Sequence, residues 1–274
     1  MSKEKIKNNN SKKYIVLQII RLILIFVIIY CLVYIFFWWR ENTASSNMLN
    51  EITESAVIDT TYVKIPVEDS ANTDDNQQSQ SNEISIPVYE LDFNKLLSIN
   101  NSTVGWINVP GTSINYPVVQ ATDNSFYLTH SFDKSKNKAG WIFADYRNKF
   151  NGLDKNIIFY GHNRMDNSMF ASLRNTQKAN WYNNKSNQYM TFTTPSGPAI
   201  YQVFSVYTIK AETYYLTTDF ADDNDFLNYA NAMKNRSVYN FGVTLTKDDS
   251  ILTLSTCDAS GKSRVILHAK KINS

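Results

Sequence analysis

A cysteine and a histidine stand where strands are expected to end, and an arginine follows the cysteine closely. Cys257 ends the run "SILTLSTC", and Arg264 comes seven positions later in "SRVILHAKKI". His162 directly follows the apolar run "KNIIFYG". A cation near a cysteine favours its nucleophilic thiolate form, and a histidine can supply the proton that a leaving group needs. These residue types indicate nucleophilic catalysis by cysteine.

The alternation of side chains around Cys257 predicts how Arg264 comes to lie near it. In an extended strand, Ser255 and Cys257 share the more polar face, while Leu252 and Leu254 point to the other side. A hairpin between this strand and the run that follows the turn would bring Arg264 back beside Cys257. Arg264 could then stabilise a thiolate or an oxyanion.

The chain has three histidines, and their surroundings differ. His162 lies in the type of strand-end loop that often displays functional groups. His130 is flanked by aromatic residues in "FYLTHSF" and is expected to be structural, whereas His268 lies in the middle of a strand and its spacing leaves its role open. His162 is therefore the preferred proton donor.

The apolar run at residues 14–39 is long enough to cross a membrane, which takes about 20 residues. Arg21 lies near one end, and Trp38 and Trp39 mark the other, as aromatic rings do at membrane interfaces. The run exceeds the apolar core of a secretory signal, and no small-residue cleavage site follows it. We expect a retained anchor. The lysine-rich segment before it predicts a cytoplasmic N-terminus and an external domain.

This topology leaves Cys257 as the lone thiol of the external domain, because Cys31 lies within the span. An unpaired external cysteine is a candidate reactive group, although a buried inert thiol is the more common case. The net charge of +2 does not favour a nucleic-acid partner. The sequence has neither CxxC nor HExxH spacing, so we expect no metal site and no cofactor.

The chain divides into four predicted regions: a cytoplasmic basic tail at 1–13, the transmembrane anchor at 14–39, a juxtamembrane helix with a disordered stalk at 40–88, and an external domain at 89–274. The segment 68–83 contains no large apolar residue, which predicts disorder. After residue 88, many short β-rich runs alternate with turn signals, and one helix is expected near residues 222–236. The fold class is mainly β, a barrel or sandwich with peripheral helices.

Six segments follow one another in the order "VGWINVPGTSINYPVVQ", "DNSFYL", "AGWIFADYRN", "NIIFYGHNRMDNSMF", "YYLTTDF" and "TLSTC". In this order they resemble segments of the class B sortases, membrane-anchored cysteine transpeptidases of Gram-positive bacteria. One departure is Asn163, where many class B members carry a second histidine, so no third catalytic residue is assigned.

The resemblance implies a closed sortase-type β-barrel and a reaction. Cys257 would cleave a C-terminal sorting signal of a surface protein after threonine, and an amine of a cell-wall (peptidoglycan) precursor would resolve the acyl-enzyme. His162 would act as general acid and then base, and Arg264 would stabilise the oxyanion or the substrate. The residues matching substrate-binding positions are Asn124, Leu128, Tyr215, Leu216, Ser255 and Asp258, the last through its backbone N–H.

The sequence leaves alternative functions open. Two of them transfer the acyl group to a different acceptor, and one is not catalytic. A membrane-tethered cysteine endopeptidase would release the acyl group to water, and a pilus-polymerising sortase would transfer it to another protein. The order of residues argues against a papain-type enzyme, in which the cysteine precedes the histidine. A non-catalytic cell-wall binding module would leave the combination of Cys257, His162 and Arg264 unexplained.

Overall fold

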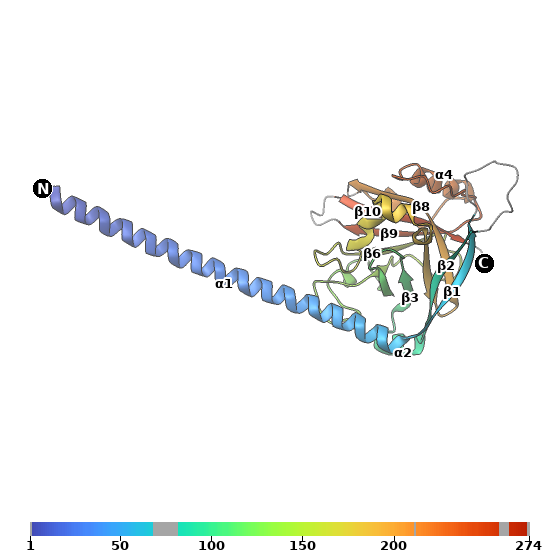
Figure 1. The fold of residues 1–274 in the computed structure, drawn as a ribbon, viewed down its shortest axis with the longest axis horizontal. Coiled ribbons are helices and arrows are strands. Elements are labelled where there is room, and N and C mark those ends of the chain that lie inside the picture. Colours follow the sequence, from blue (N-terminus) through green and yellow to red (C-terminus); the bar gives the residue numbers. More distant parts are fainter. Residues whose placement is uncertain (1, 68–81, 211, 258–262, 273–274) are drawn as a thin grey trace. The chain divides into compact units, whose positions relative to one another are not determined.

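The computed structural model describes residues 2–67, 82–210, 212–257 and 263–272. It comprises two compact units, Met1–Ser46 and Asn47–Ser274. The elements are shown in Figure 1. In order, they are α1 (Ser2–Ala56), β1 (Val57–Val67), β2 (Asn82–Leu91), α2 (Phe93–Ile99), β3 (Thr103–Asn108), β4 (Asn115–Gln120), η1 (Phe126–Leu128), β5 (Phe143–Ala144), β6 (Asn156–Gly161), η2 (Ala171–Gln177), α3 (Ala179–Asn183), η3 (Lys185–Gln188), β7 (Tyr189–Thr194), β8 (Gly197–Lys210), η4 (Tyr214–Leu216), α4 (Asp223–Lys234), β9 (Ile251–Cys257) and β10 (Ser263–Ile272).

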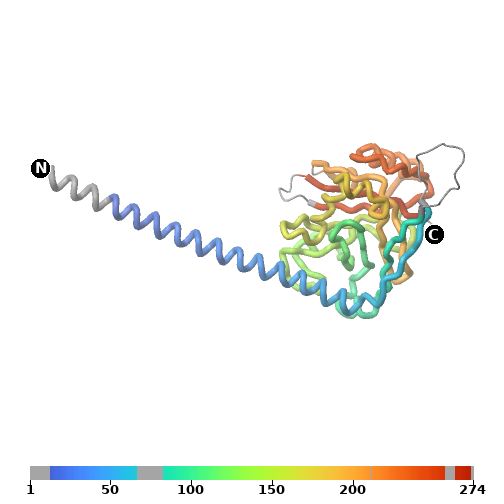
Figure 2. Tube along the Cα trace, viewed as in Figure 1, coloured from blue at the N-terminus to red at the C-terminus, as the bar shows by residue number. Residues whose placement is uncertain are grey.

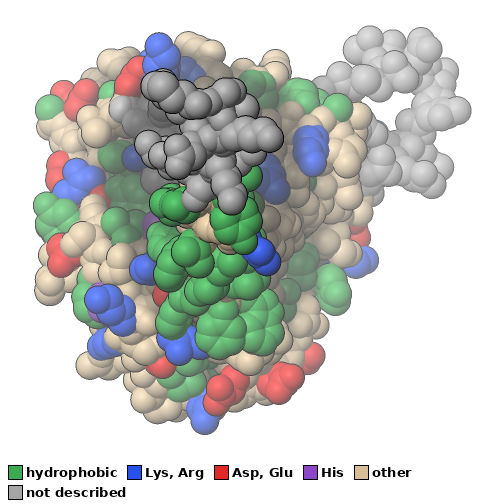
Figure 3. Space-filling view, turned by 90° about the vertical axis from the view of Figure 1, so that its left-hand side faces the viewer, with side chains coloured by type: hydrophobic (Ala, Val, Ile, Leu, Met, Phe, Trp, Pro, Cys, Tyr) green, Lys and Arg blue, Asp and Glu red, His purple; other side chains and the backbone are tan. Residues whose placement is uncertain are grey.

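The first unit is helical throughout the residues that the structure describes. Within α1, the stretch from Lys13 is long and apolar enough to span a membrane, with a mean hydropathy of 2.9 in its most apolar window. Figure 3, which looks towards the N-terminal end of α1, shows hydrophobic side chains gathered around this helix. The expected span at 14–39 falls inside it.

The last turns of α1 belong to the second unit. Ile52 and Ala56 are completely buried, and Met48 and Leu49 pack against the core. These four residues recur at helical spacing, so one face of the helix end packs on the folded unit. The expected juxtamembrane helix is present as the end of α1.

The region 40–88, expected to contain a juxtamembrane helix and a disordered stalk, also contains two strands, one on each side of its polar centre. β1 and β2 pair in antiparallel register from Val67↔Asn82 to Val57↔Leu91, and the paired strands lie side by side in Figure 2. Ile86 and Val88 are buried. The expected domain boundary at residue 89 therefore lies inside β2. The region 68–81, most of the segment for which we expected disorder, lies outside the described residues.

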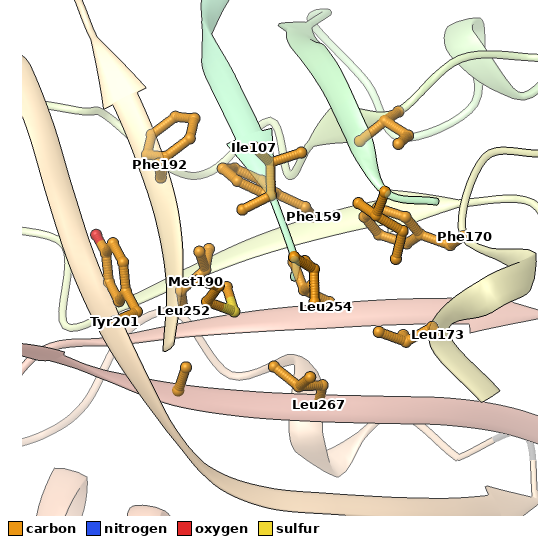
Figure 4. Close-up of a cluster of buried hydrophobic side chains, with 14 of the residues drawn as sticks. Ile107, Phe159, Phe170, Leu173, Met190, Phe192, Tyr201, Leu252, Leu254 and Leu267 are labelled. Atoms are coloured by element: carbon orange, nitrogen blue, oxygen red, sulfur yellow. The ribbon is translucent and has the colours of Figure 1, made fainter. Parts of the chain in front are cut away.

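Eight strands form a closed barrel in the order β10-β8-β7-β3-β4-β5-β6-β9, which agrees with the expected fold class. Closure leaves no exposed sheet edge, and side chains of alternating strand positions fill the interior. Figure 4 shows part of this interior, where residues from strands far apart in sequence meet. They include Ile107, Phe159, Phe192, Leu252, Leu254 and Leu267.

α2 and α4 each begin at an aspartate, and the helix expected near residues 222–236 is present as α4. Asp92 accepts a hydrogen bond from the backbone N–H of Lys95 and begins α2. Asp222 accepts from the N–H groups of Asn224 and Asp225 and begins α4, which buries Phe226, Ala230 and Met233. A carboxylate at this position pairs backbone N–H groups that have no partner within the helix.

Candidate active site

Strand register brings three of the predicted residues to one edge of the barrel. β6 and β9 are parallel, with Gly161 opposite Thr256, so the next residues along each strand are His162 and Cys257. β9 and β10 are antiparallel, with Cys257 opposite Arg264. Neighbouring strands lie about 4.8 Å apart. The backbone of Cys257 is therefore flanked by His162 on one side and by Arg264 on the other.

The ring of His162 is held by a carbonyl group and packed against a glycine. Its Nε2 lies 2.8 Å from the carbonyl oxygen of Leu128. A carbonyl oxygen only accepts, so Nε2 carries a hydrogen and Nδ1 is the nitrogen that can gain or lose a proton. Gly140 adopts a φ of +64°, and a Cβ there would lie 2.8 Å from Cδ2 of His162 and 2.7 Å from the carbonyl oxygen of Tyr127. Only glycine fits this close approach.

A cavity of about 240 Å³ lies beside His162 and Arg264. Its lining includes all the predicted substrate-binding residues within the described chain, whereas Asp258 lies outside the described residues. The lining residues are Asn124, Leu128, Phe143, Tyr160, Gly161, His162, Tyr215, Leu216, Ser255 and Arg264.

The lining comes from two loop segments and the barrel edge. Asn124 and Leu128 belong to the connection between β4 and β5, and Tyr215 and Leu216 belong to η4. The hydroxyl groups of Tyr215 and Ser255 are 3.0 Å apart, and both residues are buried. The cavity thus combines apolar side chains with a few fixed polar groups, the composition typical of a binding site.

The other two histidines take structural roles. The ring of His130 stacks on Phe126 at a centroid separation of 4.0 Å. His268 is completely buried, with Nδ1 2.8 Å from the hydroxyl of Thr253 and Nε2 3.0 Å from that of Tyr207. Burial lowers the pKa of His268 to about 3, so its ring is neutral in the folded protein.

Sequence reasoning missed a set of residues that are hydrogen-bonded to the lining of the cavity. Tyr160 lines the cavity, and its hydroxyl donates to the buried carboxylate of Asp145 at 2.7 Å. Asp145 and Arg147 form an ion pair at 2.7 Å in the segment "ADYRN". The available signal was the position of these charges directly after an expected strand, where a buried carboxylate needs a nearby partner.

Known proteins are similar to this chain in sequence and in fold. Residues 107–272 match the Sortase domain family. Sortase B of Listeria monocytogenes is 40% identical over 182 residues, which cover 65% of this chain and 72% of the relative. This chain belongs to the sortase family. Sortases are cysteine transpeptidases that anchor proteins to the cell wall, and the matches identify class B within the family.

Solved class B sortases share the fold of this sortase. The structure of a Staphylococcus aureus sortase B–substrate complex is 38% identical, with a TM-score of 0.62 over 66% of this chain and 84% of that chain. A Bacillus anthracis sortase B in complex with AAEK1 is 32% identical, with a TM-score of 0.68 over 86% of this chain and 100% of that chain. The wider match to the second structure reaches beyond the Sortase domain itself.

Among the residues that the structure describes, no group of three or more His, Cys, Asp or Glu side chains could hold a metal ion.

Proposed function

We propose that this sortase cleaves a C-terminal sorting signal after threonine and transfers the acyl group to an amine of a cell-wall precursor. The row formed by His162, Cys257 and Arg264 at one barrel edge carries the proposal. It supplies a nucleophile, a proton carrier and a fixed cation on adjacent strands. Cysteine acyl transfer needs a nucleophile and a proton carrier close to each other, and a fixed cation can stabilise the oxyanion that forms.

The proposed reaction has two steps that share the same groups. The thiolate of Cys257 attacks the carbonyl carbon of the scissile bond, and the peptide C–N bond breaks as Nδ1 of His162 gives its proton to the departing amine. A thioester remains. An incoming amine then attacks the thioester, gives a proton back to His162 and releases the thiolate. Arg264 stabilises the negative oxygen that forms in each step, and the N–H of Asp258 is proposed to join it.

The sorting signal is proposed to bind in the cavity beside the row. Asn124, Leu128, Tyr215, Leu216 and Ser255 line it and would contact the residues that precede the scissile bond. The Staphylococcus aureus relative, 38% identical, is known in a substrate complex, which supports substrate binding by this barrel.

We further propose that α1 tethers the enzyme to the membrane with its N-terminus in the cytoplasm. Lysines precede the apolar run, and positively charged flanks are retained on the cytoplasmic side. The catalytic unit would then face the outside of the cell, where the sorting signal and the precursor amine are both found.

The test incubates the enzyme with a panel of sorting-signal peptides, with and without an amine acceptor, and weighs the products. We expect cleavage after threonine and transfer to the amine. Cys257→Ala should abolish the thioester intermediate, and His162→Ala should slow turnover about 10²–10⁴-fold. A product formed only with water would favour the endopeptidase, and transfer to a protein lysine would favour the pilus-polymerising enzyme. Transfer at the wild-type rate by Cys257→Ala would refute the mechanism.

A further inference from the structure

A buried carboxylate outside the reacting row links the parts of the cavity. Asp145 has no exposed surface and follows β5 directly. Nε and Nη2 of Arg147 donate to it at 2.8 and 2.7 Å, and the backbone N–H of Arg147 donates at 3.0 Å. Tyr160 Oη and Asn124 Nδ2 add hydrogen bonds of 2.7 and 3.0 Å. Burial raises the pKa of Asp145, but the hydrogen bonds from Arg147 and Tyr160 and the charge of Arg147 outweigh it, so the pKa is lowered. A buried charge is stable only with such partners.

The partners of Asp145 reach the cavity from different segments. Asn124 and Tyr160 both line it. The amide of Asn124 is engaged at both ends, because its Oδ1 also accepts from the backbone N–H of Tyr146 at 3.0 Å. The turn at 145–147 therefore fixes how Asn124 is presented.

The hydrogen bonds of Arg147 also reach the segment 214–217, which contains η4. Three consecutive carbonyl oxygens in it accept side-chain hydrogen bonds: Tyr215 from Tyr229 Oη at 2.6 Å, Leu216 from Arg147 Nη2 at 2.9 Å, and Thr217 from Asn156 Nδ2 at 2.8 Å. The segment belongs to none of the strands. Its position depends on these side chains, and Arg147 is the one that also contacts Asp145.

We propose that Asp145 and Arg147 are positioning residues, which hold the segments 124–128 and 214–217 in their peptide-binding arrangement before the peptide arrives. A preformed site spends less of its binding free energy on ordering loops. The effect on peptide affinity rests on the proposed function, whereas the ordering of the free enzyme does not.

Hydrogen–deuterium exchange of the peptide-free enzyme tests the ordering. Leu216 N donates to the carbonyl of Thr213 at 2.9 Å, and Leu128 N donates to that of Ser125 at 3.1 Å, so both segments contain protected amides. Arg147→Met should speed exchange about tenfold at 214–217, the scale of one hydrogen bond to a charged group, and less at 124–128, where Asn124 keeps its hydrogen bonds to Asp145 and Tyr146. Asp145→Asn should speed it in both segments, because it weakens both sets of contacts.

Kinetics test the consequence for the peptide. Arg147→Met should raise KM about tenfold, with a smaller change in kcat, because it disturbs binding more than the chemical step. Arg147→Lys should restore part of the loss, since one ammonium group keeps the charge but cannot reproduce the planar fork. The matched control is Asp249→Asn, which removes a carboxylate that pairs with Lys270 at 3.1 Å and lies outside the cavity lining.

The outcomes separate this proposal from the proposed function. Local acceleration of exchange in the two variants, absent in Asp249→Asn, supports positioning even if no peptide in the panel is cleaved. Wild-type exchange in both segments for Arg147→Met would overturn it, as would acceleration spread evenly over the barrel. If Asp145→Asn does not fold, Arg147→Met alone decides.

Discussion

At the scale of single residues, the proposed active site depends on the close packing of His162 against Gly140. The substitution Gly140→Ala places a methyl group within 2.8 Å of the His162 ring and 2.7 Å of a backbone carbonyl oxygen. The ring must move, and misplacing a catalytic group by about 1 Å can cost on the order of 10²-fold in rate. We expect kcat to fall at least tenfold, measured with a cleavable sorting-signal peptide.

Gly242→Ala is the control for this substitution. Gly242 has a similar φ of +71°, but a Cβ there would meet nothing within 4 Å. It should lower stability through backbone strain without lowering kcat. Equal losses of kcat in both variants would show that contact with His162 is not the cause.

His268 gives the folded protein a dependence on pH that does not involve catalysis. Its pKa is lowered to about 3 by burial, from 6.5 in a solvated histidine. Between these two pH values the unfolded chain binds a proton that the folded protein excludes, so stability present above pH 6.5 is lost as the pH falls. The loss from this residue approaches about 1.4 kcal/mol per pH unit.

Urea denaturation between pH 7 and pH 4 measures this loss. His268→Gln keeps a polar group between Thr253 and Tyr207 but does not titrate. The variant should have a lower free energy of unfolding than the wild-type protein at pH 7, and this free energy should fall less steeply as the pH is lowered. An unchanged decline would assign the pH dependence to other groups.

At the scale of elements, the hairpin β1–β2 and the end of α1 belong to the folded unit. They contribute the buried side chains of Ile52, Ile86 and Val88. Burying one such side chain contributes about 1.5–3 kcal/mol. A chain beginning at Asn47 should therefore unfold cooperatively, whereas a chain beginning at Asp92 should have a clearly lower melting temperature. Equal melting temperatures by circular dichroism would show that the hairpin adds nothing to the stability of the barrel.

The sequence predicts elements well where local signals coincide. α4 has a carboxylate cap, an apolar face and a basic residue in its last turn. β9 alternates between Leu254, which lies in the barrel interior, and Ser255, which lines the cavity and is buried as well. β1 was not predicted because it adjoins the polar segment 68–83, whose composition predicts disorder. The parallel register that aligns His162 with Cys257 was not predicted, because the two strands are far apart in sequence; only the family resemblance placed the two residues in one active site.

Support for the site could not be read from the sequence, because its contacts are not local. Asp145 reaches Asn124 and Tyr160 across 21 and 15 positions, and Arg147 reaches Leu216 across 69. No periodicity links such residues. The contact between Gly140 and His162 also joins residues far apart in sequence, and it is apparent only in the folded chain, where Gly140 adopts a φ of +64°.

At the scale of the whole molecule, the helix α1 predicts where the enzyme works. With the N-terminus in the cytoplasm, protease added to intact protoplasts should remove the unit beyond residue 46 and leave a short membrane fragment. Mass spectrometry of the membrane fraction would identify it. Complete protection of the catalytic unit while a secreted marker is degraded would reverse the orientation, and the access to external substrates with it.

The parallel pairing of β6 with β9 also determines when the enzyme becomes active as the chain is made. The paired residues Gly161 in β6 and Thr256 in β9 are 95 positions apart, and β10, which carries Arg264, comes later still in the sequence. Contacts between segments so distant in sequence form slowly, and only after both have been synthesised. Because the chain is synthesised from its N-terminus, His162 is made well before β9, the strand that ends at Cys257. The thiol therefore meets its partners only as the barrel closes, so the growing polypeptide carries no assembled peptide-cleaving centre.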